Sequence, residues 1–297
     1  MPEFSLPGKA LEPFKQPNNS LLITTAMLDR FLVETSDLEL EPSERLRWLA
    51  INIEHDQFAD GWLSLNRVYD RSIKENPENF NTYYSLAISA LNWFEKSRTE
   101  NLIDRLAIAK MAEERIIQAI SLRPKDADLI YIYGQILYNH PERNETKDRE
   151  YSDRALAQFK RALVKDSSYC MAALYKAHCL HDQKQWQKAF EAYSEVNTEE
   201  LLKKHPHWKW RVLKLQEQRA FCCAKLNDLD KAAEILSIFL REAENLSDEE
   251  AEYDIANLNE SVELLTKIID EPEMLSRLKK IARRTEWEDF YQWETTF

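Results

Sequence analysis

Two histidines and a cysteine stand close together in the middle of the chain, at His178, Cys179 and His181. On a helix, residues three apart lie on the same face, so the two imidazoles could hold one transition-metal ion. A structural zinc site needs about four ligands, however, and no second group of Cys and His residues with suitable spacing follows. The sequence therefore predicts no metal site and no cofactor.

Other reactive side chains lack the neighbours that a reaction would require. The histidines of segment 205–210, His-Pro-His-Trp-Lys-Trp, stand in a motif typical of a packed or exposed loop. The sequence contains no HExxH, GxSxG or Cys/His nucleophile pattern. The glycines Gly8, Gly61 and Gly134 are isolated, so no glycine-rich loop can cradle a phosphate. We expect a protein that is not an enzyme and takes no small-molecule substrate.

The elements that would position these side chains are indicated by a repeat of small residues. Small residues come in four successive pairs, which are Ala87 and Ala112, Gly134 and Ala155, Ala177 and Ala189, and Ala220 and Ala232. The step from Ala155 to Ala189 is 34 residues. One helical turn after the second member of each pair stands a large apolar side chain, namely Ile116, Phe159, Tyr193 and Leu236. This spacing predicts amphipathic helices.

Small residues at matching positions favour pairs of antiparallel helices that cross closely, with large residues filling the space beside the crossing. Pro77 and Pro124 mark the ends of two second helices, because proline cannot continue the helical hydrogen-bond ladder. Only 3 glycines occur in 297 residues, and alternating strand patterns of useful length are absent. We therefore predict an all-α protein built from antiparallel helix pairs.

These features resemble the tetratricopeptide repeat (TPR) family over roughly residues 45 to 240. The second-helix halves match best, as does the stretch 179–193, CLHDQKQWQKAFEAY. The first-helix halves match more loosely, at 86–87, 133–134, 177–180 and 220. The resemblance implies a right-handed α-solenoid, a TPR-like superhelix. It also implies an adaptor or scaffold that binds a protein or peptide segment in its concave groove.

The resemblance further implies which side chains line that groove, because the first helix of each repeat faces it in the family. The groove residues carried over to this chain are Tyr84, Tyr131, Gln135, Tyr138, Tyr175, His178, His181, Gln218 and Phe221, with Asn81, Asn92 and Lys214 at further groove positions. Tyrosines among amides and imidazoles suit an extended peptide, since the rings give contact area and the polar tips give hydrogen bonds. Alternatively, some of these tyrosines fill the groove floor or contact a neighbouring helix.

One subclass of the family holds a terminal carboxylate of chaperones with a clamp of Lys, Asn and Arg. The corresponding positions here hold Asp128, Ile132, Met171 and Tyr175, so that clamp is missing. We therefore expect no chaperone C-terminus as a ligand.

The chain divides into three expected regions. Residues 1–42 form a proline-containing N-terminal extension that is partly irregular, and residues 43–240 form about five TPR-like repeats. The first repeat begins with an amphipathic helix capped by Ser43. Polar segments at 92–104, 139–148 and 201–211 read as inserted turns, which either have drifted as loops or lie near the binding face.

Residues 241–297 form the third region, in which we expect acidic capping helices and an aromatic tail. Twelve acids and two bases between positions 241 and 273 give a net charge of −10, close to the −12 of the whole chain. The basic run from Arg277 to Arg284 follows directly, so we expect it to face the acidic stretch. The aromatic residues of 286–297 either pack back on the repeats or dock a partner.

The compartment is predicted from cysteine usage and hydropathy. Cys170, Cys179, Cys222 and Cys223 fall on predicted buried helix faces, which favours reduced core thiols over disulfides. The first twenty residues lack the apolar core of a signal peptide, and no apolar run reaches the length of a membrane span. We expect a cytoplasmic protein without membrane insertion.

Three functions stay open at this point. The favoured one is a TPR-type adaptor that recognises a protein or peptide segment of unknown identity. A helical-repeat RNA-associated factor is the second, although an acidic chain is a poor electrostatic match for nucleic acid. An enzyme built on an α-solenoid is the third, and it would need a polar constellation that the sequence does not show.

Overall fold

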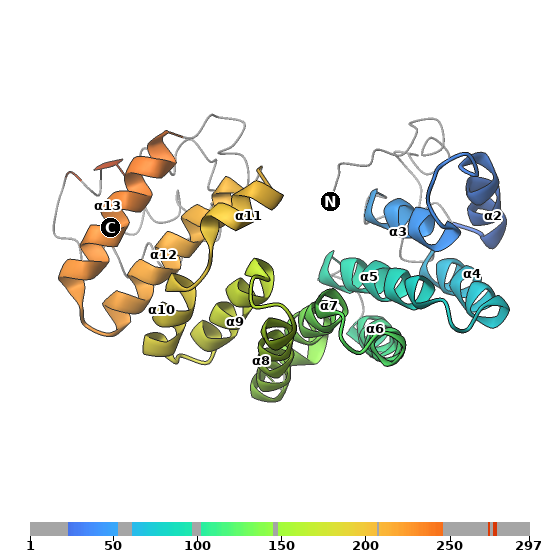
Figure 1. The fold of residues 1–297 in the computed structure, drawn as a ribbon, viewed down its shortest axis with the longest axis horizontal. Coiled ribbons are helices and arrows are strands. Elements are labelled where there is room, and N and C mark those ends of the chain that lie inside the picture. Colours follow the sequence, from blue (N-terminus) through green and yellow to red (C-terminus); the bar gives the residue numbers. More distant parts are fainter. Residues whose placement is uncertain are drawn as a thin grey trace. The chain divides into compact units, whose positions relative to one another are not determined.

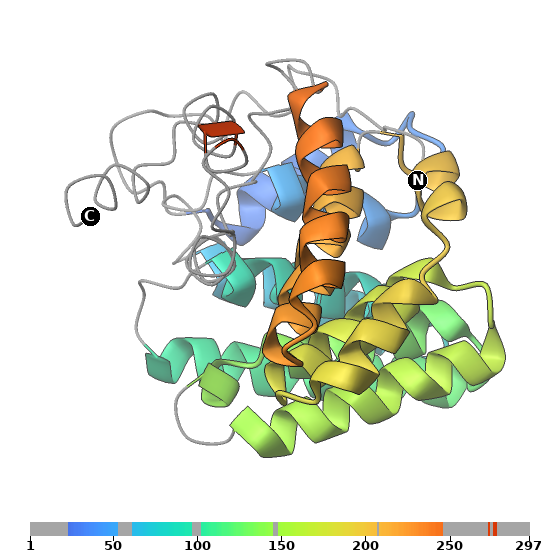
Figure 2. The same cartoon turned by 90° about the vertical axis from the view of Figure 1, so that its left-hand side faces the viewer.

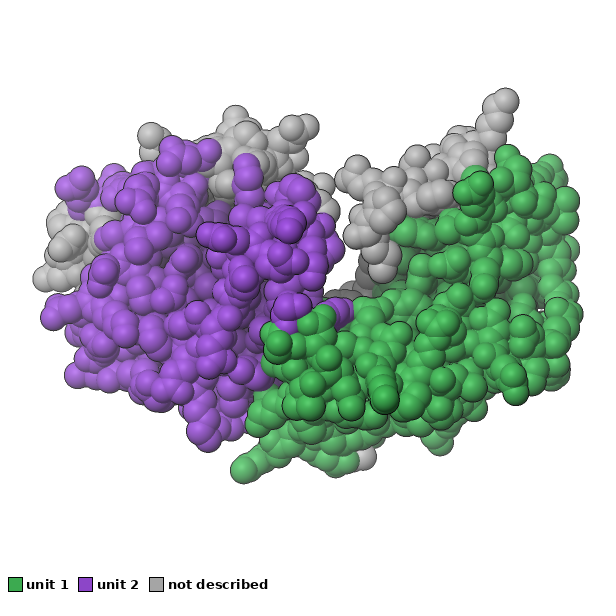
Figure 3. All heavy atoms as spheres, viewed as in Figure 1, with its two compact units in different colours: residues 1–167 green, residues 168–297 purple. Residues whose placement is uncertain are grey.

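A computed structural model describes residues 23–52, 61–96, 102–144, 148–206 and 208–245, together with 273, 276 and 277. These residues form helices and turns, and no strand occurs among them, which confirms the all-α prediction. The chain divides into two compact units, residues 1–167 and 168–297, which are coloured separately in Figure 3. Each unit is described by itself.

Unit 1 contains the first seven described α-helices, which are labelled in Figure 1, and one short 3₁₀ helix. These are α2 (Thr25–Glu34), α3 (Pro42–Asn52), α4 (Gly61–Glu75), α5 (Phe80–Lys96), α6 (Leu102–Leu122), α7 (Ala127–Tyr138), η3 (Pro141–Asn144) and α8 (Asp148–Lys165). The most extensive contacts join α5 to α6 and α7 to α8, and α3 packs on α5. Consecutive helices therefore pair as the repeat predicts.

Unit 2 contains α9 (Cys170–Asp182), α10 (Trp186–Ser194), α11 (Thr198–Lys204), α12 (Lys209–Lys225) and α13 (Leu229–Glu244). Helix α9 pairs with α10 and α12 pairs with α13, while α10 also packs against α12. Figure 2 shows the long α13 in orange, lying against α12. The short α11 packs on α9.

The small residues lie at the helix crossings, as predicted. Ala112, Ala155, Ala189 and Ala232 are all fully buried. The helices α7 and α8 cross closely, because a Cβ atom built on Gly134 would lie 2.5 Å from a ring carbon of Phe159. Only a glycine lets these two helices approach so closely.

The first helices of both pairs in unit 2 end in the same way. Lys184 follows α9 with φ 58° and Asn227 follows α12 with φ 63°, both in the left-handed region. Beyond them, the backbone N–H of Gln185 donates to the carbonyl of Leu180 and that of Asp228 donates to the carbonyl of Cys223, each at 2.9 Å. This is the Schellman pattern of a helix end. It reverses the chain within a few residues, so the second helix of each pair can fold back on the first.

The structure corrects the predicted helix cap at Ser43. Helix α3 begins one residue earlier, at Pro42, because proline has no N–H to leave unpaired and its φ suits the first helical position. The carbonyl of Glu41 accepts hydrogen bonds from the backbone N–H groups of Glu44 and Arg45, both at 3.0 Å. The Ser43 hydroxyl is buried and makes no hydrogen bond.

The segments predicted as inserted turns also differ from the prediction, since each contains helix where it is described. Helix α5 extends through Lys96, η3 occupies 141–144, and α11 precedes α12. The reason is apolar burial, because Trp93, Phe94 and Leu201 lie in these segments and are all buried. Helix α2, within the region predicted as a partly irregular extension, packs on α4 and was not predicted.

Most of the expected acidic capping helices and the whole aromatic tail lie outside the described residues. One contact of that region is visible. The guanidinium of Arg277 forms two hydrogen bonds to the carboxylate of Glu244, at 2.8 and 2.9 Å. At this one residue, the basic run meets the acidic stretch as predicted.

Among the helices that the structure describes, none is both long and apolar enough to cross a membrane. All four cysteines are buried, as predicted for core thiols. Burial raises the pKa of the Cys222 thiol to about 12, so this group is a thiol rather than a nucleophilic thiolate near neutral pH.

Candidate functional site

The nine predicted groove residues divide between the two units. Tyr84, Tyr131, Gln135 and Tyr138 belong to α5 and α7 of unit 1. Tyr175, His178, His181, Gln218 and Phe221 belong to α9 and α12 of unit 2. All nine lie on first helices of their pairs, and the two groups are considered in turn.

In unit 1, two of the predicted tyrosines are largely buried. Tyr84 is 9% exposed, and its hydroxyl donates to the Asp128 carboxylate at 2.5 Å. The guanidinium of Arg47 lies 5.3 Å from the centre of its ring. Tyr131 is 8% exposed and packs against Phe159, with ring centres 5.9 Å apart. Both rings therefore contribute mainly to packing between helices, which was the alternative left open above.

The other two predicted residues of unit 1 differ from each other. Gln135 is buried, and its Nε2 atom makes no hydrogen bond within the protein. Tyr138 is partly exposed, and the guanidinium of Arg143 lies 4.2 Å above its ring. Arg143 also donates to the Tyr138 carbonyl at 2.9 Å, which fixes the end of α7.

In unit 2, by contrast, the predicted residues form one continuous cluster. Tyr175 and His178 are in edge-to-face contact, with ring centres 5.4 Å apart, and His178 has the same relation to the buried Tyr193. The Nδ1 atom of His178 shares a hydrogen bond of 2.8 Å with the Tyr193 hydroxyl. Aromatic rings prefer this geometry, so the three side chains hold one another in place.

His178 is uncharged at neutral pH. Burial lowers its pKa from 6.5 to about 3, and the nearby His181, Lys214 and Arg211 act in the same direction. The Asp182 carboxylate opposes this shift without overcoming it. The ring is therefore a neutral hydrogen-bonding group, in which Nε2 is the position that Tyr193 does not use.

His181 joins this cluster to the next helix pair. Its ring lies 5.1 Å from that of Phe221 on α12 and 5.2 Å from that of Trp186 on α10. Trp186 and Phe221 also touch, with ring centres 5.6 Å apart. Phe221 is buried, whereas His181 and Trp186 are partly exposed. The Phe221 ring therefore forms the floor beneath the two more accessible rings.

A charged pair lies beside these rings on α12. The Lys214 ammonium is 3.1 Å from the Glu217 carboxylate, which also accepts a hydrogen bond of 2.8 Å from Gln218. Glu217 is 1% exposed, and burial raises the pKa of its carboxyl group, although Lys214 and Gln218 oppose the shift. A buried carboxylate needs such partners because its desolvation is costly.

Sequence reasoning missed one feature next to this cluster. The guanidinium of Arg211 lies 4.7 Å from the ring of Trp208 and 4.5 Å from that of Trp210, and Trp208 stacks on His205 with ring centres 3.6 Å apart. The signal was present as an arginine next to two tryptophans, but the segment was interpreted only as a loop. It places a cation between aromatic rings at the start of α12.

We refer to Tyr175, His178, His181, Lys214, Gln218 and Phe221 together as the aromatic face of unit 2. In the part of the chain that the structure describes, no three His, Cys, Asp or Glu side chains are grouped so that they could hold a metal ion. The aromatic face offers rings, one neutral imidazole and a paired lysine.

Comparisons with known proteins were made at the level of sequence and structure. No family model and no curated protein matches the sequence. Among solved structures, MamA is similar over 70% of this chain and 97% of its own, with 15% identity and a TM-score of 0.48. YrrB, described as a TPR protein with an unusual peptide-binding site, is similar over 75% of this chain and 95% of its own, with 14% identity and a TM-score of 0.45. PilW, a type IV pilus biogenesis factor, is similar over 80% of this chain and 99% of its own, with 17% identity and a TM-score of 0.46.

The class of the protein rests on its own helices. Small residues at the crossings and paired antiparallel helices define an all-α helical-repeat protein. Because similarity at this level concerns the fold alone, the function is argued from the aromatic face.

Proposed function

We propose that the protein is a non-enzymatic scaffold that binds a segment of another protein on the aromatic face of unit 2. The observation that carries this proposal is the row of partly exposed rings on α9, Tyr175, His178 and His181, above a buried floor. Residues three apart on a helix lie about 4.5 Å apart along its axis, so the row extends for about 9 Å. A peptide of a few extended residues could lie along it.

The preorganisation of these rings supports binding. Each ring is already held by neighbours in edge-to-face contact, so little side-chain freedom would be lost when a partner binds. Aromatic residues and arginines also contribute most of the binding energy in typical protein interfaces. Arg211 and its two tryptophans would extend the contact area from α9 to the start of α12.

The chemistry of the face favours a segment with hydrogen-bonding groups, because the charge of Lys214 is already paired with Glu217. Lys214 and Arg211 are the cations beside the rings, and the neutral His178 can exchange one hydrogen bond with a backbone amide. The buried thiols further support a location in a reducing compartment such as the cytoplasm, which fractionation of cells would test.

Affinity capture followed by quantitative mass spectrometry tests the proposal. Tyr175→Ala should lower the recovery of the specific partner at least about tenfold, the effect expected of an interface hot spot. Phe190→Ala is a matched control, because Phe190 is also a partly exposed ring of unit 2 but packs against Arg219 and Lys231 on the second-helix side. The Phe190→Ala variant should recover as much of the partner as the wild type does.

The proposal fails if both variants remain folded and retain the partner equally. It also fails if the recovered partner is RNA, which treatment of the captured material with ribonuclease would reveal. Circular dichroism melting curves of all three proteins show whether a loss of partner reflects a loss of fold.

A further inference from the structure

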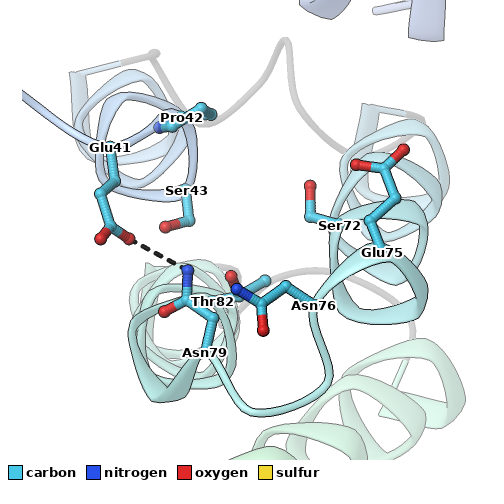
Figure 4. Close-up of a pocket in the computed structure, with 8 residues that line it drawn as sticks. All are labelled: Glu41, Pro42, Ser43, Ser72, Glu75, Asn76, Asn79 and Thr82. Atoms are coloured by element: carbon cyan, nitrogen blue, oxygen red, sulfur yellow. Dashed lines mark hydrogen bonds between the residues drawn. The ribbon is translucent and has the colours of Figure 1, made fainter.

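A small cavity in unit 1 has a chemistry that the repeat architecture does not require. It has a volume of about 190 Å³ and lies where α3 and α5 begin and α4 ends (Figure 4). Its polar lining comes from Glu41, Ser43, Ser72, Glu75, Asn76, Asn79 and Thr82. We call it the Ser43 pocket. It belongs to the unit that does not carry the aromatic face.

The floor of the pocket contains a hydroxyl without a partner. Ser43 is 4% exposed, and its Oγ atom makes no hydrogen bond within the protein. Figure 4 shows Ser43 at the start of α3, among the side chains that line the pocket. An unpaired buried hydroxyl costs stability unless something binds it. Because α3 begins at Pro42, this serine is not used as a helix cap and remains available.

Several N–H groups at the helix ends around the pocket are already hydrogen-bonded. At the start of α3, the N–H groups of Glu44 and Arg45 already bond to the carbonyl of Glu41. At the start of α5, the N–H of Asn81 bonds to the Asn79 side chain at 3.0 Å. These three amides are therefore occupied by groups of the chain itself.

The two carboxylates give the lining an excess of hydrogen-bond acceptors, and the side chains of Asn76, Asn79 and Thr82 can both donate and accept. The Ser72 hydroxyl donates its proton to the Val68 carbonyl at 3.3 Å, so its oxygen can only accept from a ligand. Glu41 receives a hydrogen bond of 3.2 Å from Asn79 on one carboxylate oxygen, which leaves acceptor capacity on the group, and Glu75 adds a second carboxylate. None of the residues that line the pocket is basic. Two formal negative charges outweigh the partial positive charges of the helix N-termini.

We propose that the Ser43 pocket binds the guanidinium group of an arginine side chain presented by a protein partner. A guanidinium carries five N–H donors and no acceptor, which matches a pocket rich in acceptors on three helices. The volume is below the roughly 300 Å³ at which drug-sized ligand sites begin, and it suits the end of one side chain. The carboxylates supply the charge, and Ser43 supplies the buried acceptor.

Titration of the full chain with N-acetyl-arginine amide tests this proposal, with the backbone amide resonances of Ser43, Asn76 and Thr82 as the readout. The shifts should saturate with the arginine derivative. They should be absent with the citrulline derivative, which has nearly the same shape but no charge, and absent with inorganic phosphate. A separate titration uses free arginine. If the natural ligand is an arginine side chain within a polypeptide, free arginine should bind no more tightly than N-acetyl-arginine amide.

Charge variants identify the groups responsible. Glu41→Gln and Glu75→Gln should each weaken binding at least about threefold, and the double variant should remove it. Glu78→Gln is the matched control, because it removes the same charge in the adjacent turn but does not line the pocket. Its affinity should equal that of the wild type at the same ionic strength.

Several outcomes would overturn the proposal. Equal shifts with the citrulline derivative would show that the pocket does not recognise charge. Larger shifts with phosphate would show that the pocket binds an anion rather than a cation. Undiminished binding in the double variant would place the guanidinium elsewhere. The probe is a single amino-acid derivative, so the result does not depend on whether the aromatic face binds a protein.

Discussion

At the scale of single residues, one glycine shows how closely the paired helices α7 and α8 approach each other. Gly134 faces the ring of Phe159, and three ring atoms lie within 2.9 Å of the position that a Cβ atom would take. Phe159 is fully buried, so its ring has no solvent-filled space to move into. The repeat pattern predicted a small residue here, and the structure shows why alanine, which serves at the other crossings, is too large.

Gly134→Ala should therefore destabilise the protein, although alanine is the better helix former by about 1 kcal/mol. Overpacking typically costs about 1–3 kcal/mol, so we expect a net loss in the free energy of unfolding, measured by urea denaturation. Adding Phe159→Leu should make Gly134→Ala less harmful than it is alone. If Gly134→Ala raises stability by its helix propensity, the crossing is looser than described.

His178 should make stability depend on pH. Its pKa is about 3 in the folded protein, against 6.5 for an unperturbed imidazole. Between these values the unfolded chain binds a proton that the folded chain does not, so stability falls as the pH falls below about 6.5. The burial of Glu217 acts in the opposite direction, because its raised pKa favours the folded state at low pH and this contribution is lost as the pH rises.

Comparison with His178→Gln isolates the histidine, since Glu217 is common to both proteins. Between pH 7 and pH 5 the wild type should lose about 1–2 kcal/mol more stability than the variant. Glutamine can keep a hydrogen bond to the Tyr193 hydroxyl, which limits the disturbance. Chemical denaturation at several pH values measures the difference, and parallel pH profiles would show that His178 is not buried as a neutral group.

At the scale of elements, the turn between the two helices of a pair is set by one residue in the left-handed region. Lys184 has this conformation after α9, where a residue with a Cβ atom is strained and glycine is not. Asn227 occupies the same place after α12 and tolerates it better. Neither position could be identified from periodicity, because the conformation depends on the backbone and not on apolar spacing.

Lys184→Gly should stabilise the protein by up to about 1 kcal/mol, because it relieves the strain of the left-handed conformation. The higher conformational entropy that glycine gives the unfolded chain reduces this gain. Lys188→Gly, four residues later within α10, provides the control and should cost about 1 kcal/mol. Thermal melts of the two variants should therefore shift in opposite directions. Equal destabilisation by both would argue against the left-handed turn.

The helices were predictable from sequence where apolar spacing decides the structure. The faces formed by Ala155 with Phe159 and by Ala189 with Tyr193 are buried as expected. The prediction was wrong in the described parts 92–96 and 201–204, where polar residues suggested turns although Trp93, Phe94 and Leu201 are buried. In these segments a few apolar residues decide the local structure, and polar composition conceals them.

At the scale of the whole molecule, the candidate site was predicted only in part. The repeat register placed all nine groove residues on first helices, but it could not tell a ring that packs between helices from one that a partner can reach. That distinction depends on contacts such as Tyr84 with Asp128 or His181 with Trp186, which join residues distant in sequence. The domain boundaries at 42 and 240 and the right-handed winding remain predictions.

The central claim is that the aromatic face of unit 2 binds a segment of a partner protein. Hydrogen–deuterium exchange of the full chain, with and without the captured partner, tests it most directly. Binding should slow exchange in 175–182 and 208–221, and it should leave exchange unchanged on the second-helix side, in 187–191 and 229–234. Protection confined to other segments, or none in the presence of a saturating partner, would contradict the claim.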